Sequence, residues 1–346
     1  MNASLQTALK WLLTFLIAGV SLYLSLKDID FKQLWNILKD ANYFWALATI
    51  PIQLFSHYIR AIRWRTILKP LMNPKSTINL FSAVMVGYFF NNLLPRGGEF
   101  IRPYVYSKRE KVSYSSVFAT IVVERILDLL TLVLLFAFAF YITREKIINA
   151  LPHDIDPNKL IYLSILLILL MALSFWRSFV LKSLKIFIKP FSNKLYNFVI
   201  ELYEKFRMGF EIIKKPSAYL RISAESLLIW FGYALPMYIT FFCFDFHHAL
   251  DIQLGDALLL VIVSGIGVTI APSPNGIGIY HYVVIVAMMN LYGIDKVNAL
   301  AYATINHALN TFVQLFVGGI FFIRERENTF LNNKHLKNIP TAENSN

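Results

Sequence analysis

Residues 91–102 read NNLLPRGGEFIR and interrupt an otherwise apolar run from Ile78 to Tyr106. A second apolar run, from Asp256 to Tyr292, is interrupted in the same way by PSPNGIG, residues 272–278. Proline removes a backbone hydrogen bond from a helix, and proline beside glycine marks a turn. Each run is therefore predicted to break near its middle instead of forming one long helix.

The composition separates this chain from ordinary soluble domains. Of its 346 residues, 57% are hydrophobic and 16% are charged, and the mean hydropathy is +0.53, far from soluble values. Six further apolar stretches approach or reach the roughly 17–25 residues of a membrane-spanning helix. They are Trp11–Leu26, Tyr43–Ile59, Ser116–Ile142, Leu160–Phe179, Ala224–Phe246 and Val297–Ile323. We predict an all-α polytopic membrane protein with a single membrane domain, residues 1–326, whose halves cover about 11–142 and 160–323.

Basic residues indicate how the interrupted runs sit in the membrane. If each run crossed once, Arg60–Lys75 and Arg102–Lys111 would lie on opposite faces, against the preference of Lys and Arg for the cytoplasmic side. If each run enters and leaves by the same face, both groups and Arg177–Arg221 lie on the cytoplasmic side. We therefore expect two re-entrant hairpins, with both termini cytoplasmic and the chain in a bacterial inner membrane.

The formal net charge of +12 does not indicate nucleic-acid binding. Residues 181–221 are basic and interleaved with aromatic side chains, which is typical of an amphipathic segment lying on an anionic cytoplasmic leaflet. Residues 327–346 form a polar tail. We expect a membrane lipid as the partner.

The two hairpins are predicted to enter from opposite faces, which is the layout of an inverted repeat. An offset of 182 residues places Glu99 on His281, Arg125 on His307, Glu124 on Asn306 and Asp128 on Asn310. Non-helical backbone at membrane depth must be buried in protein or line a wet cavity. The two breaks are therefore expected to meet and line one cavity.

Ionisable groups near the first break suggest a functional site, because such groups are expensive in a membrane. Gly97 and Gly98 open the helix that follows, and free backbone N–H groups there, helped by Arg96, would suit a phosphate. The alternative is an interfacial loop in which Arg96 extends to the head-group region.

Two further groups of polar residues fall in apolar segments. Glu124, Arg125 and Asp128 share one helical face and could form a structural ion-pair network, a transport site or both. His281 and His307 can change charge near neutral pH and are candidate proton carriers or phosphate donors, although a membrane histidine often serves as a hydrogen-bonding residue. The predicted translocation site comprises Asn91, Asn92, Arg96, Gly97, Gly98, Glu99, Arg102, Glu124, Arg125, Asp128, Pro274, Asn275, Gly276, Gly278, His281 and His307.

We expect no metal and no cofactor. Cys243 is the single cysteine, and Asp245, His247, His248 and Asp251 lack the spacing of a ligand set. No nucleotide-binding or hydrolase motif occurs.

Three motifs in order, N-x-L-L-P-R-x-G-E-x-x-R at residues 91–102, E-R-x-x-D at 124–128 and P-x-P-x-G-x-G at 272–278, resemble the flippase-like transmembrane family. That family includes the membrane region of bacterial lysylphosphatidylglycerol synthases. The resemblance implies movement of a lipid with a charged head group between leaflets, while aminoacyl transfer belongs to a soluble domain that we do not expect here. The family's Glu and Arg are replaced by His281 and His307, so we expect these two side chains to contact each other.

The function expected from the sequence is translocation of a lipid with a phosphorylated or otherwise charged head group, such as a phospholipid or a polyprenyl phosphate. Arg96 and Arg125 would bind phosphate, and Glu99 with the two histidines would respond to protons. Two alternatives stay open: an intramembrane transferase with Glu99 or Glu124 as general base, and an accessory partner of a separately encoded envelope-synthesis enzyme.

Overall fold

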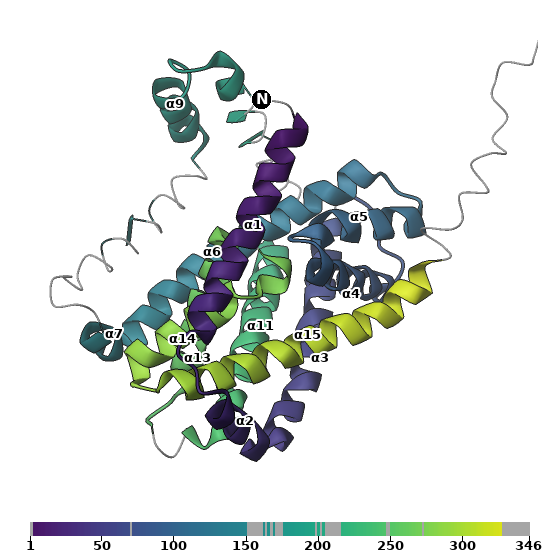
Figure 1. Ribbon diagram of the computed structural model, residues 1–346. Helices are drawn as coiled ribbons and strands as arrows, with labels where there is room; N and C mark the ends of the chain where they lie inside the picture. The colour runs from purple at the N-terminus through teal and green to yellow at the C-terminus, as the bar shows by residue number, and fades with distance from the viewer. Residues whose placement is uncertain are drawn as a thin grey trace, which may run out of the picture.

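A computed structural model describes residues 3–69, 71–150, 176–197, 216–246, 250–271 and 273–326, with positions 162, 165, 166, 169, 199, 200, 203 and 204 between them. The described part of the chain is built from helices and turns and contains no strand (Figure 1). The predicted all-α architecture is confirmed.

The described residues between positions 3 and 150 form seven helices in order. These are α1 (Ala3–Leu26), α2 (Phe31–Asp40), α3 (Tyr43–Leu68), α4 (Thr77–Leu93), α5 (Gly97–Glu110), α6 (Tyr114–Ile142) and α7 (Arg144–Ala150). The described helices that follow are α9 (Arg177–Phe187), α11 (Pro216–Phe241), η1 (Phe242–Phe244), α13 (Leu254–Ile270), η2 (Pro274–Gly276), α14 (Ile279–Tyr292) and α15 (Lys296–Arg326). Most of the predicted span Leu160–Phe179 and much of the basic segment 181–221 lie outside the described residues.

Both interrupted runs fold as pairs of short helices. Arg96 has a left-handed backbone with φ of 57° and precedes α5, and Gly278 has φ of 83° and precedes α14. The helices α4 and α5 pack so tightly that a Cβ atom on Gly98 would overlap the carbonyl oxygen of Gly87. The proline and glycine residues of both breaks therefore end one helix and start another, as predicted.

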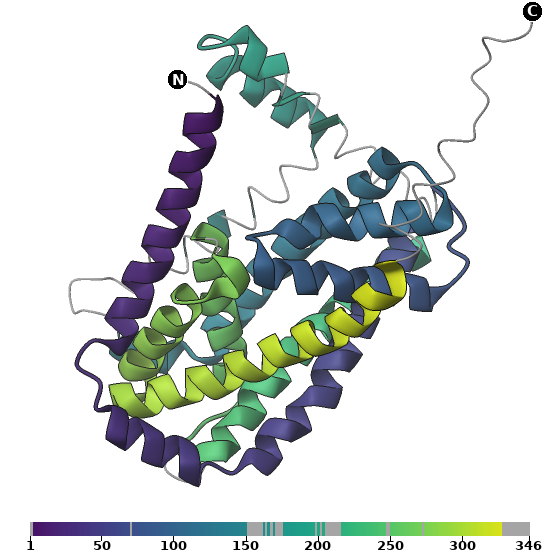
Figure 2. The ribbon, with the colours of Figure 1, turned by 45° about the vertical axis from the view of Figure 1, so that its right-hand side comes forward.

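The two breaks lie next to each other (Figure 2). The Arg96 guanidinium donates a hydrogen bond from Nη2 to the carbonyl oxygen of Thr269, in the last turn of α13, at 3.3 Å. Helix α4 also packs against η2, the 3-10 turn of the second break. Segments about 170 residues apart in the chain are thus brought together.

The two helices that follow each break start at the same offset in the two halves of the chain. Helix α5 starts at Gly97 and α14 at Ile279, while α6 starts at Tyr114 and α15 at Lys296, so that each pair is separated by 182 residues. Helices α5 and α14 also have the same length, 14 residues. The offset found from polar residues in the sequence therefore also relates the helix starts.

Charged contacts gather at the two ends of α15. Near its start, Lys296 donates to the carbonyl oxygen of Lys27. Near its end, Glu325 pairs with Arg109 of α5 at 2.8 Å, and Arg324 donates to Asn79 of α4. These two groups of charged contacts therefore lie at opposite ends of the long helix α15.

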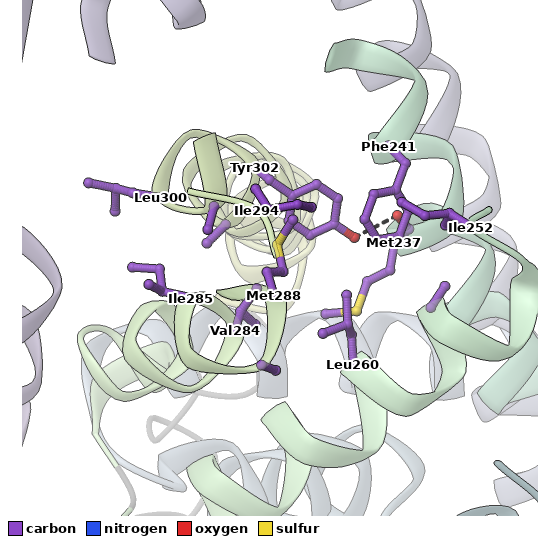
Figure 3. Close-up of a cluster of buried hydrophobic side chains, with 14 of the residues drawn as sticks. Met237, Phe241, Ile252, Leu260, Val284, Ile285, Met288, Ile294, Leu300 and Tyr302 are labelled. Atoms are coloured by element: carbon purple, nitrogen blue, oxygen red, sulfur yellow. Dashed lines mark hydrogen bonds between the residues drawn. The ribbon is translucent and has the colours of Figure 1, made fainter. Parts of the chain in front are cut away.

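The largest apolar core joins α11, α13, α14 and α15 (Figure 3). Met237, Phe241, Leu260 and Met288 pack there around Tyr302, whose hydroxyl donates to the carbonyl oxygen of Met237 at 2.7 Å. A second core packs α3, α4, α5 and α6. Each hairpin therefore has its own core, which fixes the helices that carry the polar residues.

Two described helices, Ser217–Phe244 and Lys296–Arg326, are long and apolar enough to cross a membrane by length and composition. Large apolar side chains are exposed on α6, α11 and α15, including Phe138, Phe231 and Phe316. In a membrane these side chains would contact lipid. The number of spans stays a prediction.

Candidate functional site

The polar residues of α6 lie together as their spacing predicted. The Nη2 atom of Arg125 contacts Oε1 of Glu124 at 2.8 Å and Oδ2 of Asp128 at 2.9 Å. Glu124 has no exposed side-chain surface, whereas the Arg125 side chain is 43% exposed. One edge of this group is therefore open.

Two arginines of α3 also belong to the group. They were not identified as site residues from the sequence. Arg60 Nη1 contacts Oε1 of Glu124 at 2.6 Å and Oδ2 of Asp128 at 3.1 Å. Arg63 Nη2 contacts Oδ1 of Asp128 at 2.5 Å. The sequence placed both arginines on the cytoplasmic side but gave no prediction that their side chains are buried, as both are. Their spacing of three residues on an apolar helix, which puts them on one face, was the available signal.

A fourth arginine reaches the group from α5. Arg102 donates from Nη1 and Nη2 to the two oxygens of Glu124, each at 2.9 Å. This paired geometry is among the stronger hydrogen-bonding arrangements in proteins. The guanidinium also lies 3.9 Å from the ring centroid of Trp64, which fixes its plane.

We call Arg60, Arg63, Arg102, Arg125, Glu124 and Asp128 the arginine cluster. Within it, four guanidinium groups face two carboxylates, an excess of two positive charges. Two tyrosine hydroxyls extend the network: Arg60 donates to the Tyr233 hydroxyl at 2.9 Å, which lies 3.1 Å from that of Tyr88. Uncompensated charge in a low-dielectric setting is costly. The cluster therefore favours binding of an anion.

A small cavity of about 60 Å³ opens beside the cluster. Its lining residues are Arg60, Val84, Gly87, Tyr88, Asn91, Gly98, Glu99, Arg102, Ile121 and Arg125. A water molecule needs roughly 10–15 Å³ by a comparable measure, so the cavity takes about five atoms of that size. A group as small as a phosphate could enter this space, with the rest of a head group outside it.

The turn before α5 does not offer free backbone donors. The N–H groups of Gly97, Gly98 and Glu99 donate to Leu94 O at 3.0 Å, Asn91 Oδ1 at 2.8 Å and Arg96 O at 3.1 Å, respectively. The prediction that these N–H groups are free for a phosphate is wrong, since Asn91 and local carbonyls occupy them. Arg96 contacts Thr269 rather than the arginine cluster, and the guanidinium groups that line the small cavity are those of Arg60, Arg102 and Arg125.

The second break brings the two histidines together. The rings of His281 and His307 lie 4.8 Å apart between centroids, which confirms the expected contact. His307 Nε2 lies 3.0 Å from the carbonyl oxygen of Asn275, whose Nδ2 donates to Thr311. Pro274, Gly276 and Gly278 form the turn that holds Asn275 in place, with left-handed backbone at both glycines.

The histidines line an open groove of about 680 Å³ together with Ile277, Ala308, Thr311, Phe312, Leu315 and Phe316. Seven of the predicted residues line a cavity, and they are divided between two cavities: Asn91, Gly98, Glu99, Arg102 and Arg125 line the small one, and His281 and His307 line the groove. An amide bridge lies between α4 and α15: Asn92 donates to Gln314 at 2.9 Å, and Gln314 donates to Asn310 at 3.0 Å. Gln314 was not identified from the sequence, because its partner lies 222 residues away.

In the described part of the chain, no group of three His, Cys, Asp or Glu side chains is placed to bind a metal ion. His247 and His248 lie outside the described residues.

The sequence model of the lysylphosphatidylglycerol synthase transmembrane region matches residues 11–318. The chain belongs to this family. The matched region of this chain includes both breaks, the arginine cluster and the histidine pair.

Three curated relatives are similar to this chain, two of them over most of its length. The UPF0104 membrane protein PH1989 of Pyrococcus horikoshii is 27% identical over 339 residues, covering 90% of this chain and 96% of its own. Glycosyltransferase AglD of Haloferax volcanii is 26% identical over 330 residues, which is 88% of this chain but 52% of AglD. The UPF0104 membrane protein MJ1595 of Methanocaldococcus jannaschii is 33% identical over 117 residues, 33% of this chain and 34% of its own. The family thus occurs both as a membrane protein of this length and as part of a longer protein.

Proposed function

We propose that this protein moves a lipid with a phosphorylated head group between the leaflets of a membrane. The observation that carries the proposal is the excess positive charge of the arginine cluster beside a phosphate-sized cavity, in a protein whose family is a membrane region. Buried charge without an obvious structural need is a mark of a substrate path in membrane proteins. The phosphate enters the cavity while the hydrocarbon chains stay in lipid.

The guanidinium groups of the arginine cluster differ in how accessible they are to a phosphate. Arg125 is the exposed member of the arginine cluster and meets the phosphate first. Arg60 and Arg102 also line the cavity, but both are buried and already bonded to Glu124. A phosphate would therefore gain its charge-assisted hydrogen bonds first from Arg125, whose side chain is partly exposed.

The hairpins provide the means of alternate access in this proposal. They enter from opposite membrane faces as re-entrant segments, and their breaks meet where Arg96 contacts Thr269. Rocking of one half against the other would open the cavities to each face in turn. Glu99, which lines the small cavity, is the carboxylate placed to couple this movement to protons.

A second candidate function is a role in the synthesis of envelope lipids or glycans, as an intramembrane transferase or an accessory subunit. The name of AglD, a glycosyltransferase, favours this class. Glu124 is a poor general base in such a reaction, because it is fully buried and accepts hydrogen bonds from Arg60, Arg102 and Arg125. Glu99, which lines the small cavity, is the other candidate for a general base.

Reconstitution in liposomes separates these functions. A fluorescent phosphatidylglycerol should cross between leaflets faster with the protein than without it, and Arg125→Gln should return the rate close to that of empty liposomes. Arg144→Gln removes the same charge from an exposed position on α7 and should leave the rate unchanged. Exchange at the empty-liposome rate with the unaltered protein would reject translocation and favour the second candidate.

A further inference from the structure

Tyr88 of α4 connects the arginine cluster to the small cavity, and it is not among the site residues predicted from the sequence. Its side chain is one of those that line the cavity. Its ring packs against the ring of the buried His57 on α3, with ring centroids 4.4 Å apart. Its hydroxyl lies 3.1 Å from that of Tyr233 on α11. Contacts from two other helices therefore fix the position of Tyr88 beside the cavity.

The hydrogen bonds of Tyr233 run in one direction. A guanidinium group can only donate, whereas a phenolic hydroxyl can accept and also donate its one proton. The oxygen of Tyr233 accepts from Nε and Nη2 of Arg60, at 3.2 Å and 2.9 Å. Both lone pairs of this oxygen are then used, and Tyr233 is left with its own proton to give. The hydrogen bond between the two tyrosines therefore runs from Tyr233 to Tyr88.

The Tyr88 hydroxyl consequently keeps a proton of its own to donate. In the described part of the chain, this hydroxyl contacts Tyr233 and has no acceptor for that proton. A donor that is shielded from water and left without a partner costs free energy. Because Tyr88 lines the small cavity, its O–H group is a donor that a ligand in the cavity can use.

We propose that Tyr88 donates a hydrogen bond to a phosphate oxygen of the lipid in the small cavity, and that Tyr233 is the positioning residue that directs this donor. The inference rests on the proposed translocation and adds two residues to its binding site. Arg102 already uses Nη1 and Nη2 for Glu124, so Tyr88 supplements the partly exposed Arg125. A hydrogen bond from a hydroxyl to a charged oxygen is short and roughly twice as strong as one between neutral groups.

Removal of one hydroxyl group tests the contact. Binding of fluorescent phosphatidylglycerol to the full-length protein is measured in detergent micelles. Tyr88→Phe keeps the ring, and we expect it to weaken binding roughly tenfold, as for a hydrogen bond to a charged group. Tyr58→Phe removes a hydroxyl from an exposed position on α3 and should leave binding unchanged. Equal binding by the two variants overturns the proposal.

The same substitution in a Tyr233→Phe background tests the direction of the hydrogen bond. Without the Tyr233 hydroxyl the proton of Tyr88 is no longer directed to the cavity, so Tyr88→Phe should then weaken binding by less than about threefold. A role in packing alone would give the same loss in both backgrounds, and that result overturns the role of Tyr233. If Tyr88→Phe does not fold, Tyr233→Phe alone should weaken binding, and unchanged binding rejects the proposal.

Leaflet exchange separates this proposal from the translocase. Binding that Tyr88→Phe weakens, without exchange by the unaltered protein, would keep the contact and reject the translocase. Exchange by the unaltered protein, with binding that Tyr88→Phe leaves unchanged, would do the reverse. Inorganic phosphate should compete poorly with the labelled lipid. Competition equal to that of unlabelled phosphatidylglycerol would show a free-anion site and overturn the assignment of the phosphate to a lipid.

Discussion

Glu124 has no exposed side-chain surface and accepts hydrogen bonds from guanidinium groups on three helices, α3, α5 and α6. Arg60 and Arg102 are buried with it, while Arg125 keeps part of its surface exposed. Removing one partner of a buried ion pair leaves the other charge uncompensated. At the scale of single residues, Glu124 therefore links the arginines to one another, and Arg125 is the one that a ligand can reach from outside.

Glu124→Gln is expected to destabilise the protein strongly. The substitution keeps the size of the side chain but leaves four arginines facing one carboxylate, and breaking a buried pair costs about 3–5 kcal/mol. Unfolding followed by heat or denaturant in detergent measures the loss. Glu145→Gln, at an exposed position on α7, is the matched control and should change stability little. Equal stability of the two variants would contradict the description of Glu124.

At the scale of elements, the hairpin of α4 and α5 depends on the absence of a side chain at Gly98. The backbones approach so closely there that a methyl group would meet the Gly87 carbonyl, and a Cβ on Gly87 would lie 3.1 Å from that of Arg102. The Asn91 side chain then accepts from the Gly98 N–H. This close contact sets the position of Glu99 and Arg102 in the small cavity.

Gly98→Ala should separate α4 from α5, because the obstructing atom belongs to the backbone and cannot rotate away. We expect lower stability and loss of leaflet exchange, measured by unfolding and by liposome assay. Gly265→Ala is the control: nothing lies within 4 Å of a Cβ there, and alanine is favoured over glycine inside a helix by roughly 0.5–1 kcal/mol. A Gly98→Ala protein as stable and active as Gly265→Ala would show that the close approach is unimportant.

The elements themselves were largely predictable, and the contacts between them were not. The breaks at residues 91–102 and 272–278 follow from proline and glycine, and the triad of α6 follows from helical spacing. Burial of Arg60 and Arg63 depends on carboxylates 61–68 residues away in the chain, which local patterns do not reveal. Charge counting assigned these arginines to the cytoplasmic side and could not reveal the carboxylates that bury them.

At the scale of the whole molecule, charged contacts lie at the two ends of α15, and this helix also lines the groove. The start of α15 contacts Lys27, and its end contacts α4 and α5 through Asn79 and Arg109. If these ends face opposite sides of the membrane, the positive-inside preference assigns the end with α5 to the cytoplasm. The proposed movement of a lipid between leaflets therefore requires this membrane topology as well as the binding site.

Single cysteines should report this topology. Lys32→Cys on α2 and Lys108→Cys on α5 are both at exposed positions, and native Cys243 is buried. In intact cells a membrane-impermeant maleimide should label the cysteine at position 32 and leave that at position 108 unlabelled until the membrane is opened. Labelling of both from the same side would contradict the predicted hairpins.

The most direct test compares head groups in the same liposomes. Leaflet exchange of fluorescent phosphatidylglycerol should be faster with the protein than without it, whereas a lipid with the same chains but no phosphate, such as a diacylglycerol bearing a neutral sugar, should gain nothing. The arginine cluster predicts this difference because its excess charge recognises the phosphate. Equal acceleration of both lipids, or of neither, would contradict the account.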